Sequence, residues 1–337
     1  MRVFCPLGLL ASLLVGCTGA EGSADVLRLG YFANITHAPA IIGVDRGFFE
    51  DALGPDVKLE LVTFSSGPEA VEALFSGSVD ATFIGPNPAI SGYQKSEGDA
   101  LRIVAGTTSG GASLVVRDGI DSVADLEGTT LATPSLGNTQ DVALRSWLSD
   151  QGFNADTSAG GDVSIRPQEN ADTLTAFIDG QIDGAWVPEP WATRLVLEGQ
   201  GKVLIDESEL WPDGDFVTTH LVVGREYLAK FPTNIERLVN GLITALDWIA
   251  TNDSEAMAAA NAGIKEITSK ELNPETIKRA WSNLSFTYDP IANSLEKCKD
   301  NAVAVGLLDP VDLDGIYELS PLNSVLKKRG LAEIGVV

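Results

Sequence analysis

Histidine is almost absent from this chain, whose 337 residues include only His37 and His220. Two histidines cannot supply the zinc and iron sites that need three of them. Three cysteines cannot build a disulfide-rich scaffold either. Basic residues are scarce, since 23 Lys and Arg stand against 47 Asp and Glu and the net charge is −24. This charge balance argues against nucleic acid as a partner and against a polybasic membrane-surface patch.

Long hydrophobic runs are also missing, apart from one stretch at the N-terminus. After Met1 and Arg2, residues 3–15 form an apolar run of about 13 residues, too short to span a bilayer but suited to a signal peptide. The run ends in Leu-Val-Gly followed by Cys17, which resembles the lipobox of bacterial lipoproteins. We therefore predict a signal peptide over residues 1–16 and a flexible linker over residues 17–24. A plain secretory signal with a chance cysteine is the alternative.

A lipidated Cys17 would fix the location of the mature protein. It predicts a protein of the cell envelope, on the extracytoplasmic side of the cytoplasmic membrane and attached to it through lipid only. Cys5 would be removed with the signal, which leaves Cys298 as the remaining free thiol.

The rest of the chain has the composition of an ordinary folded protein, with 44% hydrophobic and 21% charged residues. At about 150 residues per domain, its length suggests two domains. Strand-like runs at residues 26–31, 59–64 and 80–85 alternate with segments whose apolar residues recur at helical spacing. Short loops between strand, helix and strand predict parallel pairing in an open α/β sheet.

The same order of segments then recurs. Residues 74–80 have the sequence Leu-Phe-Ser-Gly-Ser-Val-Asp, and residues 177–183 have Phe-Ile-Asp-Gly-Gln-Ile-Asp. Both copies continue through a strand into a proline-containing loop, Gly-Pro-Asn-Pro at 85–88 and Pro-Glu-Pro-Trp at 188–191. Convergence is the alternative, because a helix ended by glycine before a strand is common. The agreement in order, spacing and loop chemistry predicts two similar Rossmann-like lobes.

Two extended, β-branched runs flank the second copy, at residues 113–117 and 216–224. We interpret them as a double crossover that forms a two-strand hinge. Lobe one would then comprise residues 25–112 plus 218–337, and lobe two residues 113–217. Ligands of open α/β sheets lie beyond the carboxyl ends of the strands, so we expect the ligand in a cleft between the lobes. The chain after the second crossover is predicted to be helical at residues 235–249, 255–265, 274–284 and 291–305.

Three segments carry a resemblance to a known family: residues 64–84, Leu-Glu-Gly-Thr-Thr-Leu-Ala at 126–132, and Asp-Gly-Ala-Trp-Val-Pro-Glu-Pro-Trp at 183–191. They resemble the substrate-binding proteins of ABC importers for nitrate, taurine and aliphatic sulfonates. The resemblance covers nearly all of the chain after the signal. It implies the type II periplasmic-binding-protein architecture, an α/β fold whose two lobes have open mixed sheets and a two-strand hinge. It also implies a small organic anion as ligand, with an aliphatic sulfonate or taurine first, and ABC permease transmembrane subunits as partners.

Other classes stay open beside this interpretation. Nitrate, bicarbonate and pyrimidine-precursor binding proteins share these motifs, and some relatives of the fold are enzymes. A structural or adhesive lipoprotein is a further alternative. The sequence contains no Gly-x-Ser-x-Gly elbow, Walker loop, His-Glu-x-x-His or paired-cysteine motif. We therefore predict a monomeric binding protein without catalytic residues, cofactor or metal.

Polar, glycine-containing loops follow the predicted strands and open helices. Free N–H groups and the positive end of a helix dipole bind small anions without lysine or arginine. Hydroxyl and amide side chains would complete the oxygen contacts, although capping the helices is their alternative role. The ligand residues predicted in these loops are Asn34, Thr36, His37, Ser66, Gly67, Asn87, Ser109, Gly110, Asn138, Thr139 and Gln140.

Aromatic residues at the ends of two strands are candidates for the wall of an apolar ligand tail. Tyr31 and Phe32 end the first strand, and Trp191 follows a strand of lobe two. For Trp186, inside that strand, we predict core packing. His220 lies in a hinge strand, where contact with the ligand and a structural role both stay open.

Glu189 stands between two prolines directly after the same strand. If its carboxylate faces the cleft, it predicts a ligand with an ammonium group, such as taurine, because a buried carboxylate needs a partner. The alternative is a structural carboxylate that caps the following helix or pairs with Arg194 across the lobes.

Overall fold

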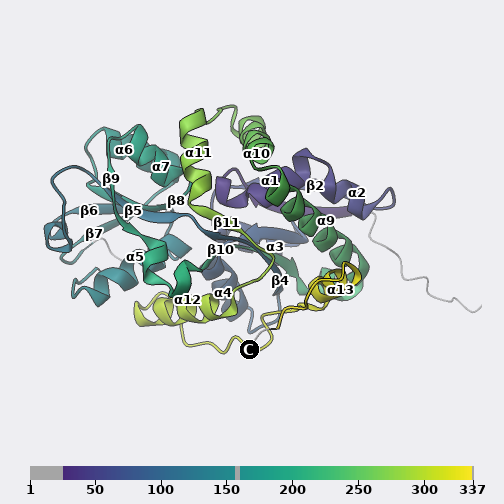
Figure 1. Cartoon of the computed structure of the whole chain (residues 1–337). Helices are drawn as coiled ribbons and strands as arrows, with labels where there is room; N and C mark the ends of the chain where they lie inside the picture. Colours follow the sequence, from purple (N-terminus) through teal and green to yellow (C-terminus); the bar gives the residue numbers. More distant parts are fainter. Residues whose placement is uncertain (1–25, 156–159, 336–337) are drawn as a thin grey trace, which may run out of the picture.

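The computed structural model describes residues 26–155 and 160–335. The predicted signal, linker and lipid attachment at Cys17 lie outside the described residues. The strands form two mixed sheets that lie side by side (Figure 1). We call the part built on the six-stranded sheet lobe one and the part built on the five-stranded sheet lobe two. In the described ranges, none of the helices combines the length and apolar character needed to cross a bilayer.

The sheet of lobe one has the strand order β11-β4-β10-β3-β1-β2. The strands β1, β2 and β3 are parallel, whereas β10 runs antiparallel between β3 and β4. The strands are β1 (Val26–Phe32), β2 (Lys58–Phe64), β3 (Ala81–Ile84), β4 (Leu101–Gly110), β10 (Val217–Gly224) and β11 (Leu284–Phe286).

The sheet of lobe two has the order β7-β6-β8-β5-β9, in which β5 is the antiparallel strand. Order and direction match those of β2-β1-β3-β10-β4 in lobe one, so the two lobes share one plan. The strands are β5 (Ala112–Val116), β6 (Thr130–Thr133), β7 (Ser164–Pro167), β8 (Gly184–Pro188) and β9 (Lys202–Asp206).

The repeat predicted from the sequence has a structural basis in two aspartates. Asp80 N–H donates to the carbonyl of Arg28, and the N–H of Arg28 donates back to the Asp80 carboxylate, both at 2.8 Å. In lobe two, Asp183 and Thr130 exchange the same pair of bonds, also at 2.8 Å. Each aspartate thus aligns a strand with the start of its parallel neighbour. The aspartate at the end of each copy, Asp80 or Asp183, fixes the register of two parallel strands, which explains why it recurs.

Two segments connect the lobes. The first passes through Gly110 and Gly111, whose φ angles of +80° and +75° favour glycine, and carries the chain from β4 into β5. The second runs from β9 to β10 through two short 3-10 turns, η3 (Glu207–Leu210) and η4 (Pro212–Gly214). Ser109 pairs with Val217, so the two crossovers lie next to each other. We keep residues 25–112 plus 218–337 and residues 113–217 as our proposed lobe ranges.

Helices cover both faces of each sheet because each face carries its own cluster of apolar side chains. One face of lobe one packs against α1 (Ala38–Asp45), α2 (Phe48–Leu53), α8 (Arg225–Lys230), α9 (Pro232–Thr251), α10 (Asp253–Thr268), α11 (Pro274–Ser282) and α13 (Ser320–Lys328). The other packs against α3 (Gly67–Phe75), α4 (Pro86–Lys95) and α12 (Ala292–Ala304). In lobe two, η2 (Val123–Leu126) and α5 (Thr139–Asp150) cover one face, α6 (Asn170–Ile178) and α7 (Trp191–Leu197) the other.

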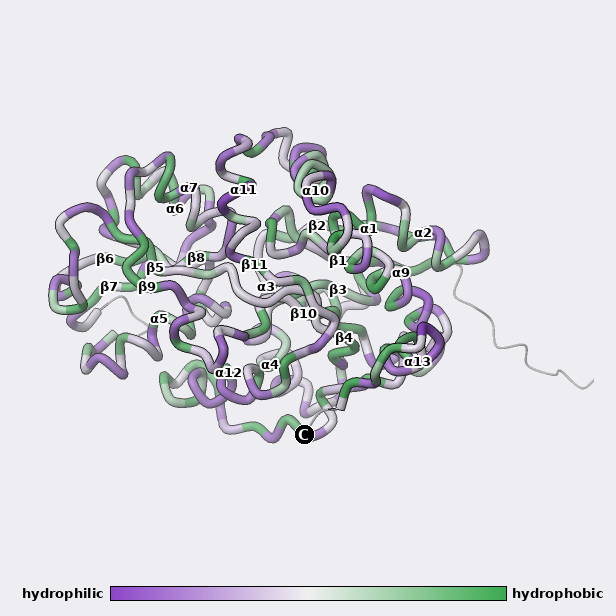
Figure 2. The backbone as a smooth tube through the Cα atoms, in the orientation of Figure 1, coloured by the Kyte–Doolittle hydropathy of each residue, from purple (hydrophilic) through white to green (hydrophobic). Residues whose placement is uncertain are grey.

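The long helix α9 shows why these helices form. Its buried residues Ile235, Leu238, Leu242, Leu246 and Ile249 recur every three or four positions and face the sheet. Figure 2 shows hydrophobic and hydrophilic residues alternating along α13, which packs its buried face on the core and leaves its other face exposed.

Two predictions about secondary structure need correction. Ser109 and Gly110 are not in a helix-opening loop but end strand β4, which is buried along nearly its whole length and therefore has no alternating pattern to identify it. The predicted helix at residues 274–284 ends at Ser282, and Leu284 begins the edge strand β11.

Candidate functional site

A cavity lies between the lobes, where the strands of both sheets end. Phe32 at the end of β1 and Gly85 after β3 come from lobe one, and Pro134 after β6 and Pro188 at the end of β8 come from lobe two. This is the position at which open α/β sheets bind ligands. The centres of water molecules can occupy about 30 Å³ of it, which is room for about two or three waters. In the described conformation the cavity therefore suits a compact molecule.

The first turn of α5 supplies the polar groups on the side of lobe two. Asn138, Thr139 and Gln140 line the cavity, and the side chain of Asn138 does not cap its own helix. The N–H groups of Thr139 and Gln140 have no acceptor within the described ranges. The buried hydroxyl of Thr139 also lacks a partner there. A helix N-terminus with free donors attracts an anion.

The lobes approach each other closely at this turn. A Cβ atom on Gly85 of lobe one would lie only 2.6 Å from Thr139 Oγ1. The absence of a side chain at Gly85 therefore permits the N-terminus of α4 to face the N-terminus of α5 across the cavity.

The loop after β1 supplies the polar groups on the side of lobe one. The Thr36 carbonyl accepts hydrogen bonds from the hydroxyls of Thr108 (2.7 Å) and Thr219 (3.1 Å), which hold the loop against β4 and β10. The ring of His37 stacks on Phe32 with 4.5 Å between the ring centroids. The loop therefore has a fixed conformation before any ligand enters.

His37 is neutral at pH 7, because burial lowers its pKa to about 3. Its Nδ1 atom has no hydrogen-bond partner in the described part of the chain, and neither has Asn170 Oδ1 from lobe two. Both residues line the cavity. A neutral imidazole offers one N–H donor and one acceptor nitrogen, so it can bond to an anion without a salt bridge.

Among the described residues, those that line the cavity include no lysine, arginine, aspartate or glutamate. Among residues 26–155 and 160–335, no group of three His, Cys, Asp or Glu side chains is placed to hold a metal ion. The cavity can therefore bind a ligand through neutral donors and helix dipoles. Such a site suits a ligand with a small total charge, because an uncompensated buried charge is costly.

Glu189 lies outside the cavity and is bound on two sides. Its carboxylate accepts from the N–H (3.1 Å) and the hydroxyl (2.9 Å) of Thr193 in α7, and from Asn283 Nδ2 of lobe one at 2.7 Å. Burial raises the pKa of this carboxyl, and these hydrogen bonds oppose the rise. Arg194 pairs with Glu198 at 2.6 Å. Of the two structural roles considered, the structure shows the capping contact and not the pair with Arg194.

Six of the residues predicted from the sequence line the cavity: Asn34, Thr36, His37, Asn138, Thr139 and Gln140. Trp191 lies beside it and donates to Asn34 Oδ1. The lining does not include the other predicted ligand residues, Tyr31, Ser66, Gly67, Asn87, Ser109, Gly110 and Glu189.

Specific contacts explain why three of these predicted residues do not line the cavity. Tyr31 packs in the hydrophobic core with α1, α9 and α10, so its neighbour Phe32 is the residue that faces the cavity. Asn87 donates to the Cys298 carbonyl at 3.1 Å and lines a different pocket. Gly67 approaches the side chain of Pro88.

Three further residues considered in the sequence analysis, Trp186, His220 and Cys298, are buried in the protein. Trp186 is fully buried, as predicted for a core residue, and packs edge to face on Trp147. His220 is buried beside the Pro290 carbonyl, and burial lowers its pKa to about 4. Cys298 is buried too, which raises the pKa of its thiol.

Sequence reasoning missed Ser65, Gly85, Asn170, Pro188 and Thr218. The repeat contained the signal for Asn170, because the alignment of residues 74–80 with 177–183 places Asn170 opposite Gly67, at the first residue of α6 and α3 respectively.

Comparison with known proteins places these features in a family. The model of the NMT1-like family matches residues 20–264. A Bacillus subtilis (strain 168) protein whose name assigns it to the binding of aliphatic sulfonates is 25% identical over 329 residues, which cover 94% of this chain and 93% of that protein.

Two solved structures show the same fold. The alkanesulfonate-binding protein of Xanthomonas axonopodis pv. citri, determined with MOPS bound, superposes with a TM-score of 0.74 at 20% identity and covers 88% of this chain and 99% of its own. The periplasmic nitrate-binding protein of Synechocystis PCC 6803 has a TM-score of 0.71 at 16% identity, with 90% and 89% covered.

Proposed function

The chain belongs to the NMT1-like family and is a solute-binding protein of the sulfonate and nitrate group found in ABC-type import systems; we propose that its solute is a compact oxyanion with a single negative charge. Nitrate and bicarbonate are the ligands of this class. The relatives bind solutes and are not enzymes, and no catalytic step is part of the proposal.

The observation that carries this proposal is the set of unpartnered polar atoms in the cavity. Thr139 Oγ1, His37 Nδ1 and Asn170 Oδ1 are buried without hydrogen-bond partners in the described ranges. The free N–H groups of Thr139 and Gln140 and the Thr139 hydroxyl need an acceptor, whereas Asn170 Oδ1 is itself an acceptor and needs a donor such as the hydroxyl of bicarbonate. A buried donor left unpaired costs about 1–3 kcal/mol, so a ligand that pairs with these atoms gains affinity.

Charge and size narrow the ligand class. The lining offers helix N-termini and neutral side chains but no cation, which suits one negative charge better than two. The cavity is small, since the centres of water molecules can occupy only about 30 Å³ of it, and this volume matches an anion of a few heavy atoms. Both arguments favour nitrate or bicarbonate over sulfate or phosphate.

An aliphatic sulfonate is the second candidate. Its apolar tail would lie against Phe32, Pro134 and Pro188, which line the cavity, and the lobes would have to separate further to admit it. The Bacillus subtilis relative, similar over nearly the full chain, supports this candidate by its name.

Calorimetry with sodium nitrate, sodium bicarbonate, ethanesulfonate, taurine and sodium sulfate tests the proposal. We expect nitrate or bicarbonate to bind at micromolar concentration and sulfate to bind at least tenfold more weakly. Binding of ethanesulfonate alone would establish the second candidate. Absence of binding for all five compounds would contradict both.

We also propose that Cys17 is lipidated and holds the protein at the extracytoplasmic side of the cytoplasmic membrane, near the permease of an ABC importer. The support is the lipobox-like sequence before Cys17 and the periplasmic location of one structural relative. In a bacterial host, the wild type should sediment with membranes, and Cys17→Ala should be released or remain unprocessed. A correctly processed, membrane-bound Cys17→Ala protein would contradict this proposal.

A further inference from the structure

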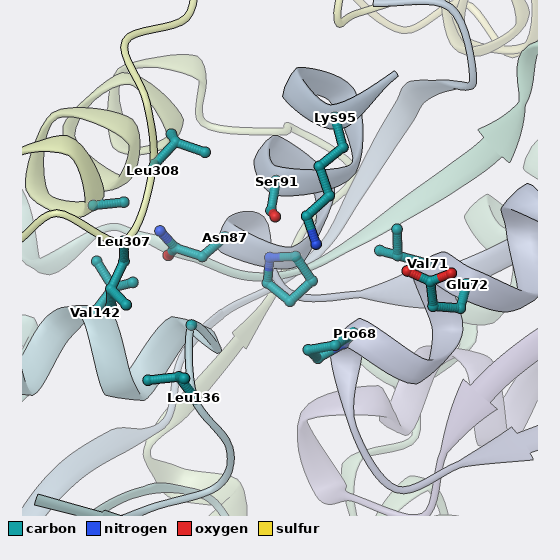
Figure 3. A pocket seen from close by; sticks show the side chains of 13 residues that line it. Pro68, Val71, Glu72, Asn87, Ser91, Lys95, Leu136, Val142, Leu307 and Leu308 are labelled. Atoms are coloured by element: carbon teal, nitrogen blue, oxygen red, sulfur yellow. The ribbon is translucent and has the colours of Figure 1, made fainter. Parts of the chain in front are cut away.

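A second pocket, shown in Figure 3, lies between the lobes. It shares no lining residue with the cavity at the strand ends. Lobe one contributes residues of α3, α4 and the segment after α12, and lobe two contributes Leu136, Gly137 and Val142. The centres of water molecules can occupy about 250 Å³ of this pocket, far more than in the first cavity. It therefore has room for a molecule larger than a simple oxyanion.

Helix α4 presents a polar stripe to this pocket. Asn87, Ser91 and Lys95 recur at intervals of four residues, so they lie on one face of the helix. Asn87 is only 4% exposed, and although its Nδ2 atom donates to the Cys298 carbonyl, Oδ1 has no partner in the described chain. A buried amide oxygen without a donor indicates an occupant that carries an N–H or O–H group.

Two opposite charges lie on the right-hand side of the pocket in Figure 3. Lys95 and Glu72 both extend toward its interior, and neither forms an ion pair with another residue in the described ranges. Their charges cancel, so the pocket favours an occupant without net charge. An anionic occupant would gain from Lys95 but would be repelled by Glu72.

The remaining wall is apolar. Val71 of α3, Val142 of α5, and Leu307 and Leu308 after α12 line it, with Leu136 at the edge. Leu136 is 50% exposed, and an aliphatic group in the pocket would cover part of it. The occupant therefore needs an apolar body as well as polar groups.

We propose that this pocket binds a short aliphatic zwitterion, with an aliphatic α-amino acid as the type. The ammonium group donates to Asn87 Oδ1, the carboxylate accepts from Lys95, and the alkyl group packs on the leucines and valines. Because both lobes line the pocket, its occupant stabilises the closed arrangement of the lobes. Binding here and binding of the anion are therefore mutually reinforcing. This coupling rests on the proposed function, whereas the binding of the zwitterion does not.

Calorimetry of the full chain with L-leucine tests the proposal, and three variants sharpen it. Ser91→Leu places a larger apolar side chain in the middle of the polar stripe, removes no hydrogen bond of the described residues, and should abolish leucine binding. Lys95→Gln should weaken it about tenfold or more, because a hydrogen bond to a charged group is lost. Lys327→Gln is the matched control, since Lys327 is also an exposed lysine in the last turn of a helix, and it should bind as the wild type does.

A second titration separates this site from the first cavity. Saturating leucine should increase nitrate affinity in the wild type and leave it unchanged in Ser91→Leu. Thermal melts should show that Ser91→Leu and Lys95→Gln are folded. Lack of leucine binding without nitrate, wild-type affinity in Ser91→Leu, or equal affinity for leucine and butylamine would overturn the proposal. Competition between leucine and nitrate would place leucine in the first cavity and would overturn it too.

Discussion

The indole N–H of Trp191 in lobe two donates to Asn34 Oδ1 in lobe one, with 2.9 Å between nitrogen and oxygen. Asn34 lines the cavity, and the Trp191 ring is covered on another side by the guanidinium of Arg194 at 4.7 Å from its centroid. This hydrogen bond exists only when the lobes meet. It therefore links the position of a cavity residue to closure of the lobes.

Removing that bond should weaken anion binding. Trp191→Phe keeps an aromatic ring but loses the N–H, so the closed form loses a bond worth about 0.5–1.5 kcal/mol. We expect a decrease of about two- to tenfold in nitrate affinity by calorimetry, or in the affinity of whichever anion binds. Trp248→Phe is the control, because Trp248 packs on Phe48 in lobe one away from the cavity. Unchanged affinity in Trp191→Phe would show that the bond does not contribute to closure.

Thr139 allows affinity and stability to be separated. Thr139→Val removes the unpartnered hydroxyl and keeps the shape of the side chain. Anion affinity should fall about tenfold or more, because a hydrogen bond to a charged ligand is worth about 1.5–3 kcal/mol. The free energy of unfolding without ligand should stay equal or rise, since a buried hydroxyl without a partner is lost. Denaturant titration and calorimetry measure the two, with Thr175→Val on the exposed side of α6 as control. A loss of stability equal to the loss of binding energy would contradict this assignment.

Glu189 should not distinguish taurine from ethanesulfonate. Its carboxylate oxygens already accept hydrogen bonds from Thr193 and Asn283, and the residue lies outside the cavity. The carboxylate is therefore not available to a ligand ammonium group. Glu189→Gln removes one acceptor and should lower the free energy of unfolding by about 1–3 kcal/mol. The affinity ratio of taurine to ethanesulfonate should change less than about twofold. A variant that loses taurine alone would show that Glu189 serves as an ammonium site.

Glu207 gives the protein a pH dependence that does not involve the ligand. It is fully buried in the second crossover and accepts a hydrogen bond from Trp186 Nε1 at 2.7 Å. Burial raises its pKa from 4.5 to about 7; hydrogen bonds from Trp186 and Trp211 oppose the rise, as does the charge of Lys297, whereas Asp206 adds to it. The stability due to the protonated carboxyl is complete below pH 4.5 and is lost as the pH rises through 7.

Glu207→Gln isolates this effect, because glutamine stays uncharged and still accepts from Trp186. The difference in free energy of unfolding between the variant and the wild type should change in favour of the variant by about 3 kcal/mol from pH 5 to pH 8. Denaturant titrations at both pH values measure it. Glu209→Gln, an exposed neighbour, should show no such change. A constant difference for Glu207→Gln would mean that the carboxyl is ionised throughout.

The sequence predicted the fold better than the site for a physical reason. The repeat at residues 74–80 and 177–183 reflects two requirements within each lobe: a glycine at positive φ and an aspartate that bonds to a neighbouring strand. Because each lobe places these residues at the same spacing, the repeat can be recognised from the sequence alone. Strand β4 was missed because a strand buried on both faces has no alternation.

The site depends on contacts that join distant parts of the chain. That Phe32 and not Tyr31 faces the cavity follows from the pleat of β1 relative to its covering helices. That Asn87 faces another pocket follows from the approach of α12, and that Glu189 is already paired follows from Asn283. None of these neighbours lies near its partner in sequence. The place of the α5 residues at the cavity could be predicted, because free N–H groups are a property of any helix start.

The place of β10 between β3 and β4 determines when each lobe of the protein can fold during synthesis. As the chain emerges, β3 and β4 are made first, then the whole of lobe two, and β10 follows only after it. The early strands thus hold unpaired edges until residues 217–224 arrive, and unpaired edges invite aggregation. Lobe two, which is translated between the two parts of lobe one, can therefore complete its sheet first, and lobe one is exposed to aggregation for longer.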